Sequence, residues 1–455
     1  MVELSLSRVQ AGQNEDILKR ELTDRQLVMI GLGSAIGTGL FMGSSLSIHY
    51  AGPAVILSYL GTAVIVVMMV YCLAKMSMVY PTAGSFGIHA EKVLGPWFGY
   101  LVRYTYWAAN AITVGGEATA VGLYMKMWFP AVPTWIWVVL FAFIIFIVNA
   151  MSVKSFGLFE YWFSSIKVLA IVGFIVLGGI LIFGDPSRSM SNLQAQGGFI
   201  PHGWSGIWMG IVMATFSFMG TEIVAVTAGE AKQPKKVLMR SMKWLVLRLI
   251  LFYVLAMTVM LAVVPWDQVG GETVEQSPFV KVLEHLDIPF AAGVMNVIIL
   301  TAAMSTMNAN LYACTRMMFS LAQSGFAPRA WGKVNDKGVP LHALTASSFG
   351  LGVAVLLNLL TPKAYNTMFG ISIFGGIFTW IIIFVTYFCY RRQTAHKLSW
   401  AALTGAGVLA AILLTMLLDA AWMYAIVTGL VWIGSLSAVY WIMNGKKAKQ
   451  AKASS

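Results

Sequence analysis

Long runs of apolar residues, separated by short polar connections, fill almost the whole chain. About 20 mostly apolar residues cross the hydrocarbon core of a bilayer as a helix, and by this measure the sequence contains about twelve transmembrane helices. The runs lie at residues 27–48, 54–79, 97–127, 134–151, 158–184, 204–229, 243–265, 289–322, 341–360, 365–390, 400–418 and 421–443. The connections are too short for a separate soluble core. The pattern therefore predicts an all-α polytopic membrane protein with one transmembrane domain over residues 27–443.

Two of the runs, five apart in order, are interrupted near their middle by small and polar residues. The first reads LVMIGLGSAIGTGLFMGSSL over residues 27–46, and the sixth contains GIVMATFSFMGTEIVAVTAG over residues 210–229. Glycine costs a helix interior about 1 kcal/mol relative to alanine, so both stretches predict helices that break within the membrane. Close packing of helices through small residues is the other interpretation of this pattern.

The order of the breaks indicates an internal repeat. The first and sixth runs are both interrupted, and the third and eighth are both unusually long. Many transporters consist of two halves of opposite orientation, with broken helices at the substrate site. We therefore expect a 5+5 inverted repeat with broken helices 1 and 6, its halves at about residues 27–184 and 204–390, followed by helices 11 and 12 at 400–443.

Composition and charge agree with a membrane protein and indicate its orientation. The 455 residues are 58% hydrophobic and 11% charged, with a net charge of +12. An even number of helices puts residues 1–26 and 444–455 on one side, and Lys and Arg accumulate in cytoplasmic connections. With both termini in the cytoplasm, the connections outside hold only the basic residues Lys126, Arg188, Lys281 and Lys363. This asymmetry favours a plasma (inner) membrane location with cytoplasmic termini, and it explains the positive charge without nucleic-acid binding.

Three stretches carry a resemblance to a known family. They read LTDRQLVMIGLGSAIGTGLF at residues 22–41, FSFMGTEIVAVTAGEAKQPKK at 216–236 and NANLYACTRMMFSLAQSGFAPR at 308–329. In this order they resemble the amino acid transporter (amino acid permease) family of the amino acid-polyamine-organocation superfamily. The resemblance implies the five-plus-five fold, a substrate site between broken helices 1 and 6, and uptake of amino acids that is commonly coupled to protons.

An amino acid zwitterion needs partners in mid-membrane that replace its lost water. The backbone N–H groups of Gly37, Thr38 and Gly39, at the start of the outer half of helix 1, suit the carboxylate because a helix N-terminus is positive.

The ammonium is assigned to freed carbonyls. The resemblance implies that the carbonyls of Ala35, Phe216 and Met219 accept its hydrogen bonds. Ser217 and Gly220 complete the predicted break of helix 6. The family also places an aromatic lid over the substrate at the position of Phe216, for which packing against lipid is the alternative.

Three charged residues lie deep within the predicted spans, where a charge is costly. Lys167 resembles a helix 5 lysine that, in proton-coupled relatives, takes the place of a sodium ion between helices 1 and 8. Its expected partners are helix 1 carbonyls and Ser305 or Thr306. Glu222 lies at the helix 6 break and Glu117 midway along helix 3. All three are candidates for proton coupling, with Lys167 as the first choice and Glu222 or Glu117 next, and a fixed structural role is the alternative for each.

Arg103 and Arg316, nearer the inner ends of their helices, are expected to pair or to reach the membrane surface. The cysteines and histidines show no ligand spacing, so we expect no metal and no cofactor apart from a coupling ion, for which H+ is the first choice.

The expected function is proton-coupled uptake of a neutral L-amino acid. An exchanger, or a transporter of a cationic amino acid or amine, stays open because Glu222 lies near the predicted site. A channel or a nutrient receptor that does not transport are alternatives of a different class. The sequence has no HExxH or GxSxG motif, and we expect no enzyme activity. The expected partners are a small amino acid substrate and the lipid bilayer.

Overall fold

The structure is a computed structural model that describes residues 18, 20–80, 82, 84–194, 197–230, 234–271, 277–285, 290–361, 364–420 and 422–453. Most of the predicted N-terminal segment 1–26 lies outside these residues, as does Lys232 of one basic connection. The described residues form helices and no strands.

Twelve groups of helices follow the predicted runs in order. The α-helices are α2 (Asp24–Ala35), α3 (Thr38–Phe41), α4 (Ser44–Ala51), α5 (Val55–Val79), α6 (Ser85–Leu94), α7 (Pro96–Met125), α8 (Thr134–Met151), α9 (Val153–Gly184), α10 (Pro186–Gln194), α11 (Gly203–Ser217), α12 (Ile223–Thr227), α13 (Pro234–Val263), α14 (Trp266–Val269), α15 (Pro278–His285), α16 (Ala291–Gln323), α17 (Leu341–Ser347), α18 (Phe349–Leu360), α19 (Ala364–Ala395), α20 (Trp400–Leu418) and α21 (Met423–Ala453).

Both predicted breaks are present. The first run is divided into α2, α3 and α4, and the sixth into α11 and α12. Within the described part of the chain, nine helical segments are long and apolar enough to cross a membrane. The all-α polytopic architecture is confirmed, whereas the exact bounds of the two repeats, 27–184 and 204–390, stay a prediction.

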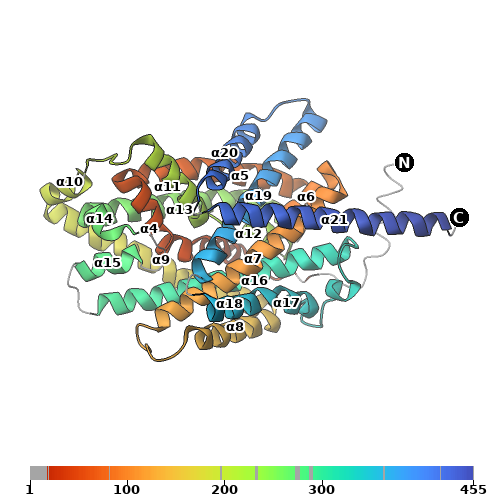
Figure 1. The fold of residues 1–455 in the computed structure, drawn as a ribbon, viewed down its shortest axis with the longest axis horizontal. Coiled ribbons are helices and arrows are strands. Elements are labelled where there is room, and N and C mark those ends of the chain that lie inside the picture. Colours follow the sequence, from red (N-terminus) through yellow and green to blue (C-terminus); the bar gives the residue numbers. More distant parts are fainter. Residues whose placement is uncertain are drawn as a thin grey trace.

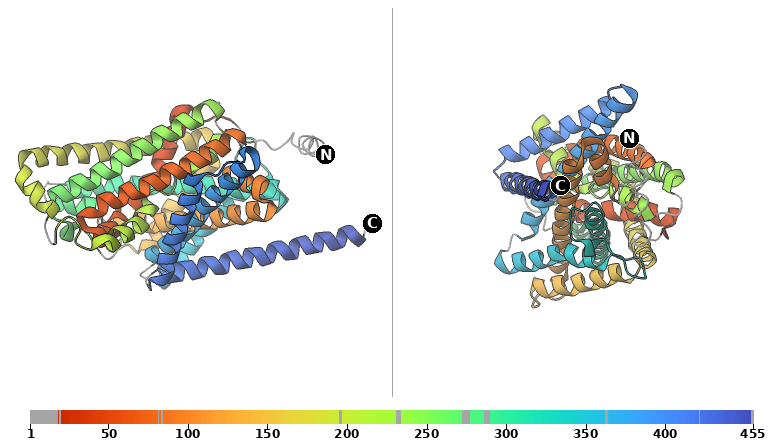
Figure 2. Two further views of the ribbon diagram at one scale, coloured as in Figure 1. Left: turned by 90° about the horizontal axis from the view of Figure 1, so that it is seen from above. Right: turned by 90° about the vertical axis from the view of Figure 1, so that its right-hand side faces the viewer.

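The long helices run side by side along the longest dimension of the molecule (Figure 1). At its centre α7 packs along α16, and α19 packs against α7. α21 lies along the outside of the bundle and extends beyond it (Figure 2). The broken helices are thus enclosed by continuous ones, which keeps their irregular backbone away from lipid.

The two ends of the bundle differ. At one end, here called the termini end, Leu18 belongs to a buried cluster with Leu436 and Tyr440 of α21. The amide of Leu22 donates to the carbonyl of Glu230 at 3.1 Å. The short helices α10, α14 and α15 lie at the opposite, far end (Figure 1).

Two arginines at the termini end are buried with carboxylate partners. Arg103 is 0% exposed and bonds Glu91. Arg316 is 2% exposed and donates through two nitrogens to Glu230, at 2.7 and 3.2 Å. Of the two expectations for these arginines, pairing and extension to the surface, the structure shows pairing. These ion pairs tie α7 to α6 and α16 to the end of helix 6.

Removing one member of a buried ion pair leaves an uncompensated charge, which costs about 3–5 kcal/mol. We expect Arg316→Leu to lower the free energy of unfolding by this amount, measured by denaturation in detergent. The double variant Glu230→Leu/Arg316→Leu is expected to recover most of the loss. The matched control is Arg329→Leu, because Arg329 is exposed. Equal stability of Arg316→Leu and the control would contradict the prediction.

Candidate functional site

The helix 1 break leaves two backbone amides without a backbone acceptor among the described residues. α2 ends at Ala35 and α3 begins at Thr38. The amide of Gly37 donates to the carbonyl of Ala35 at 3.1 Å. Among the described residues, the amides of Thr38 and Gly39 reach no backbone carbonyl. Of the three amides predicted to meet a carboxylate, that of Gly37 is engaged within the break, that of Thr38 faces the Glu117 carboxyl group, and that of Gly39 has no backbone acceptor among the described residues.

The helix 6 break depends on a glycine. Gly220 has φ +97°, a conformation that side-chain-bearing residues rarely adopt. A Cβ at this position would also lie 2.5 Å from the carbonyl oxygen of Ser34. The hydroxyl of Ser34 in turn donates to the carbonyl of Gly220 at 2.9 Å. The two breaks thus touch each other, and glycine permits both the turn and the approach.

Side chains fasten the breaks together. The hydroxyl of Tyr253, on α13, lies 2.8 Å from the carbonyl oxygen of Ala35 and 2.7 Å from that of Ser217. It has one proton and so donates to one carbonyl at a time. The hydroxyl of Ser217 donates to the carbonyl of Gly39 at 2.6 Å. Tyr253 was not among the candidates from the sequence, because a tyrosine within an apolar run gives no signal of its partner.

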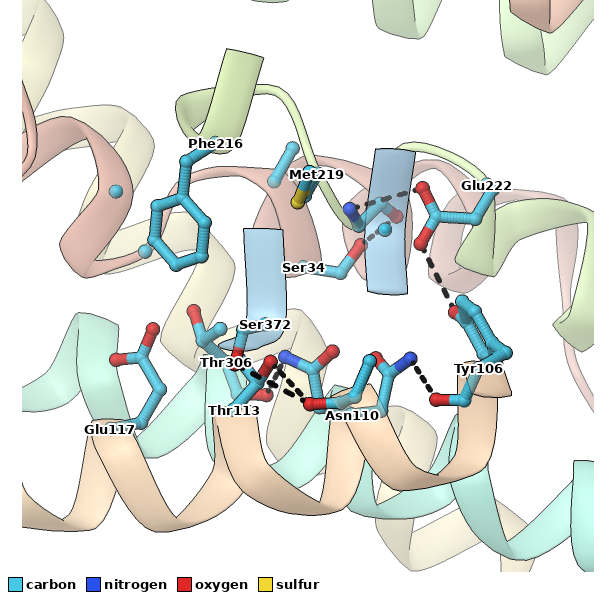
Figure 3. A pocket seen from close by; sticks show the side chains of 17 residues that line it. Ser34, Tyr106, Asn110, Thr113, Glu117, Phe216, Met219, Glu222, Thr306 and Ser372 are labelled. Atoms are coloured by element: carbon cyan, nitrogen blue, oxygen red, sulfur yellow. Dashed lines mark hydrogen bonds between the residues drawn. The ribbon is translucent and has the colours of Figure 1, made fainter. Parts of the chain in front are cut away.

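A small cavity of about 40 Å³ lies between the breaks and α7, α16 and α19 (Figure 3). Six of the predicted substrate-site residues line it. They are Ala35, Gly37, Gly39, Phe216, Met219 and Gly220. Thr38 and Ser217, the remaining two, do not line the cavity but are their direct neighbours in the chain. The structure therefore brings the two predicted breaks together around one enclosed space.

Phe216 forms one wall of this cavity. Its ring centre lies 4.2 Å from that of Phe369 on α19, and Phe369 in turn contacts Trp422. Phe216 is only 9% exposed. The ring thus packs against protein and borders the cavity, as a lid would, and the alternative of packing against lipid does not describe it.

Glu117 has one partnered and one unpartnered oxygen. The hydroxyl of Thr38 donates to its Oε1 at 2.8 Å and accepts a hydrogen bond from Tyr365 at 3.0 Å. Oε2 is buried and has no partner among the described residues. Glu117 lines the cavity (Figure 3). Its carboxyl group therefore lies beside the amides of the helix 1 break.

Glu222 is fully partnered. Tyr106 donates to Oε1 at 3.1 Å, and Trp380 and the amide of Gly220 donate to Oε2, each at 3.1 Å. These three donors lie on α7, on α19 and in the break between α11 and α12, which correspond to predicted helices 3, 10 and 6. The carboxylate thus braces the turn of the helix 6 break against two other helices, and no oxygen is left without a donor.

Lys167 of α9 binds the backbone of the helix 1 break. It is fully buried, and its ammonium donates to the carbonyls of Gly33 and of Ile36, the latter at 2.8 Å. The expected helix 1 carbonyls are thus its partners. The expected partner Ser305 instead donates to Glu160.

Glu160 is a buried acid that the sequence-based candidates omitted. It accepts hydrogen bonds from the hydroxyl of Ser305 and from the side-chain amide of Asn308, the latter at 3.0 Å. A Cβ on Gly33 would overlap the Glu160 carboxylate, so this carboxylate lies against Gly33. The carbonyl of Gly33 is one of the two that bind Lys167. The signal was available, because Glu160 precedes Lys167 by seven residues, which places both on one face of α9.

Known proteins match almost the whole chain. Residues 26–450 match the family model of amino acid permeases. The chain belongs to the amino acid permease family. The permease is 36% identical to the uncharacterized amino acid permease YtnA of Bacillus subtilis, over 96% of this chain and 97% of the relative. It is 38% identical to the gamma-aminobutyric acid permease of Bacillus subtilis, over 84% and 82% of the two chains. It is 36% identical to the aromatic amino acid transport protein AroP of Escherichia coli, over 86% and 85%.

The comparisons confirm the family that the three sequence stretches resemble. The permease is an integral membrane protein, as the family and its apolar helices require. The names of the relatives refer to different amino acids, so membership does not by itself identify the substrate.

The close approach at Gly39 gives a test of the site. A Cβ there would lie 2.9 Å from the ring of Phe216 and 3.1 Å from Cα of Ser217. We expect Gly39→Val to abolish amino acid binding by the permease while membrane insertion persists, measured by a thermal-shift binding assay on purified protein. Gly179→Val is the matched control, because a Cβ at Gly179 meets no atom within 4 Å. Unchanged affinity in Gly39→Val would show that this wall does not form the site.

Proposed function

We propose that this permease is a secondary active transporter that takes up a neutral L-amino acid with protons by alternating access. The observation that carries this proposal is the cavity between two broken helices, with the amides of Thr38 and Gly39 on one side and a buried carboxyl group with an unpartnered oxygen beside them. A single cavity bordered by both breaks suits a carrier better than a continuous ion path.

The breaks offer partners for both ends of a zwitterion. The amides of Thr38 and Gly39 receive the carboxylate. The carbonyl of Met219, which accepts no hydrogen bond from any described residue, receives the ammonium. The carbonyl of Ala35 is a second acceptor whenever the Tyr253 hydroxyl donates to Ser217. These contacts recognise only the carboxylate and the ammonium group, which all amino acids share.

Proton coupling follows from the position of Glu117. A substrate carboxylate on the amide of Thr38 would lie near the Glu117 carboxyl group, which already binds the Thr38 hydroxyl. Two negative charges in a site of low dielectric repel each other strongly. A proton on Glu117 removes that repulsion and turns Oε2 into a donor. Binding of substrate and binding of a proton therefore favour each other.

Other titratable groups suit this role less well. Glu222 has a donor at each oxygen, and Lys167 does not line the cavity. His89, on α6 outside the spans, is buried, and burial lowers its pKa to about 4, so it stays neutral at physiological pH. Lys167 supports the helix 1 break, and Glu160 lies beside the same break.

The proposed orientation places the termini end in the cytoplasm of a cell with a plasma (inner) membrane. It is supported by the asymmetry of basic residues between the connections. Exchange without net uptake, transport of a cationic amino acid or amine, a channel, and a receptor that does not transport remain the competing functions. Saturable uptake with counterflow in proteoliposomes separates a carrier from a channel or receptor.

The coupling is tested with Glu117→Gln, which mimics the protonated acid. We expect this variant to retain amino acid exchange but to lose accumulation driven by an imposed pH gradient, because it cannot release a proton. Both activities are measured in proteoliposomes with radiolabelled alanine. Glu284→Gln serves as the control for altered charge, because Glu284 is exposed and does not line the cavity. Accumulation that requires a sodium gradient and ignores pH, or full pH-driven accumulation by Glu117→Gln, would refute proton coupling through this residue.

Lys167 is tested separately for its support of the break. Lys167→Met keeps the apolar stem and removes the donors to Gly33 and Ile36. We expect pH-driven accumulation to fall at least about tenfold, the effect of losing roughly 1.4 kcal/mol. Lys243→Met is the matched control, because Lys243 is exposed. If Lys167→Met accumulates substrate as well as the control does, the ammonium is dispensable.

A further inference from the structure

The cavity has a second wall, opposite the breaks. In the proposed binding mode, the carboxylate and ammonium groups of the amino acid do not contact this wall. It is formed by polar side chains of three continuous helices. They are Asn110 and Thr113 of α7, Thr306 and Asn310 of α16, and Ser372 of α19. In the proposed binding mode the substrate side chain points toward this wall.

The two amides on this wall are held in one orientation. Nδ2 of Asn110 donates to the carbonyl of Tyr106 at 2.8 Å, and Nδ2 of Asn310 donates to that of Thr306 at 2.8 Å. Because each nitrogen bonds the carbonyl one turn earlier, each Oδ1 is turned away from its own helix. Figure 3 shows Asn110 directed into the cavity with its nitrogen engaged on the Tyr106 side. Both Oδ1 atoms are hydrogen-bond acceptors.

Two hydroxyl groups on the wall also act as acceptors. Thr113 donates its proton to the carbonyl of Ala109 at 2.9 Å, and Ser372 donates to that of Met368 at 2.9 Å. A hydroxyl whose proton is engaged offers only its lone pairs. Thr306 is the exception, because its buried hydroxyl has no partner among the described residues. A ligand that contacts this wall therefore needs to supply hydrogen-bond donors.

We propose that this wall is the subsite for the substrate side chain, an inference that rests on the proposed function. The wall selects amino acids with a short, uncharged side chain that carries a hydrogen-bond donor, namely serine, threonine or asparagine. Asn110 is the main specificity-determining residue. It lies on the central helix α7 and lines the cavity, and its nitrogen is already engaged by the carbonyl of Tyr106.

Two observations favour this class over the others. An aliphatic side chain would bury the acceptors of the wall without replacing the hydrogen bonds that they make to water, which is costly. A cationic side chain would need a carboxylate, but Glu222 already has three donors and Glu117 lies at the other end, beside Thr38.

The test compares amino acids of nearly equal shape in competition against a radiolabelled substrate on the purified full-length permease. The pairs are threonine with valine, asparagine with leucine, and serine with alanine. A site built to bond a hydroxyl or amide rejects the apolar analogue strongly, so we expect threonine and asparagine to bind at least about tenfold more tightly than valine and leucine. Valine equal to threonine, or leucine equal to asparagine, in the wild-type protein overturns the inference and needs no variant.

Asn110→Leu tests the residue itself. We expect the ratio of threonine to valine affinity to fall to within about threefold, while alanine affinity changes less. Asn110→Asp, nearly equal in shape, is a second variant in case the first does not fold, and we expect it to shift the preference toward cationic side chains. The matched control is Asn358→Leu, because Asn358 bonds Thr119 and Ala354 and does not line the cavity. An unchanged threonine to valine ratio in a folded Asn110 variant overturns the assignment.

The outcomes separate this inference from the function on which it rests. If no amino acid binds, including glycine and alanine, the proposed function fails and this inference fails with it. If alanine, valine and leucine bind as well as their polar counterparts, the permease function stands and only the side-chain selectivity is wrong.

Discussion

A helix that is broken inside a bilayer exposes backbone groups that lipid cannot hydrogen-bond, and this constraint organises the centre of the permease. Helices 1 and 6 both break there, at Ala35–Thr38 and Ser217–Ile223. Each freed donor or acceptor must meet another backbone, a side chain or a ligand. The side chains of Ser34, Ser217 and Tyr253 accordingly bond backbone groups of the two breaks.

Most of the freed groups are satisfied by the protein itself. Ser34 bonds the carbonyl of Gly220, Ser217 bonds that of Gly39, and Lys167 bonds two carbonyls of helix 1. The Tyr253 hydroxyl, with a single proton, lies between two carbonyls. What remains are a few donors and acceptors on one enclosed space. A ligand that supplies both a carboxylate and an ammonium completes the set, and this is the physical reason why a broken-helix pair suits an amino acid.

The sequence predicted the parts of this arrangement that depend on local chemistry. Clustered glycines cannot favour a continuous helix, so the breaks near Gly37 and Gly220 were visible, and apolar run lengths gave the helices. The partners could not be predicted in the same way. Tyr253 and Asn110 lie in apolar runs, and only the packing of α13 and α7 brings them to the breaks. Glu160 was overlooked although it shares a helix face with Lys167, because its partners on α16 are distant in sequence.

Buried carboxyl groups near the centre have different roles because they have different numbers of donors. Glu222 receives three hydrogen bonds from protein, so its charge is compensated and its position is fixed by helices 3, 6 and 10. Glu160 is surrounded by donors of α9 and α16. Glu117 is hydrogen-bonded only by Thr38 among the described residues, and its Oε2 is buried without a partner. An ionised carboxylate with an empty oxygen is costly in such a place, so this acid gains most from a proton. Because it also borders the cavity, it is the acid on which the proposed proton coupling rests.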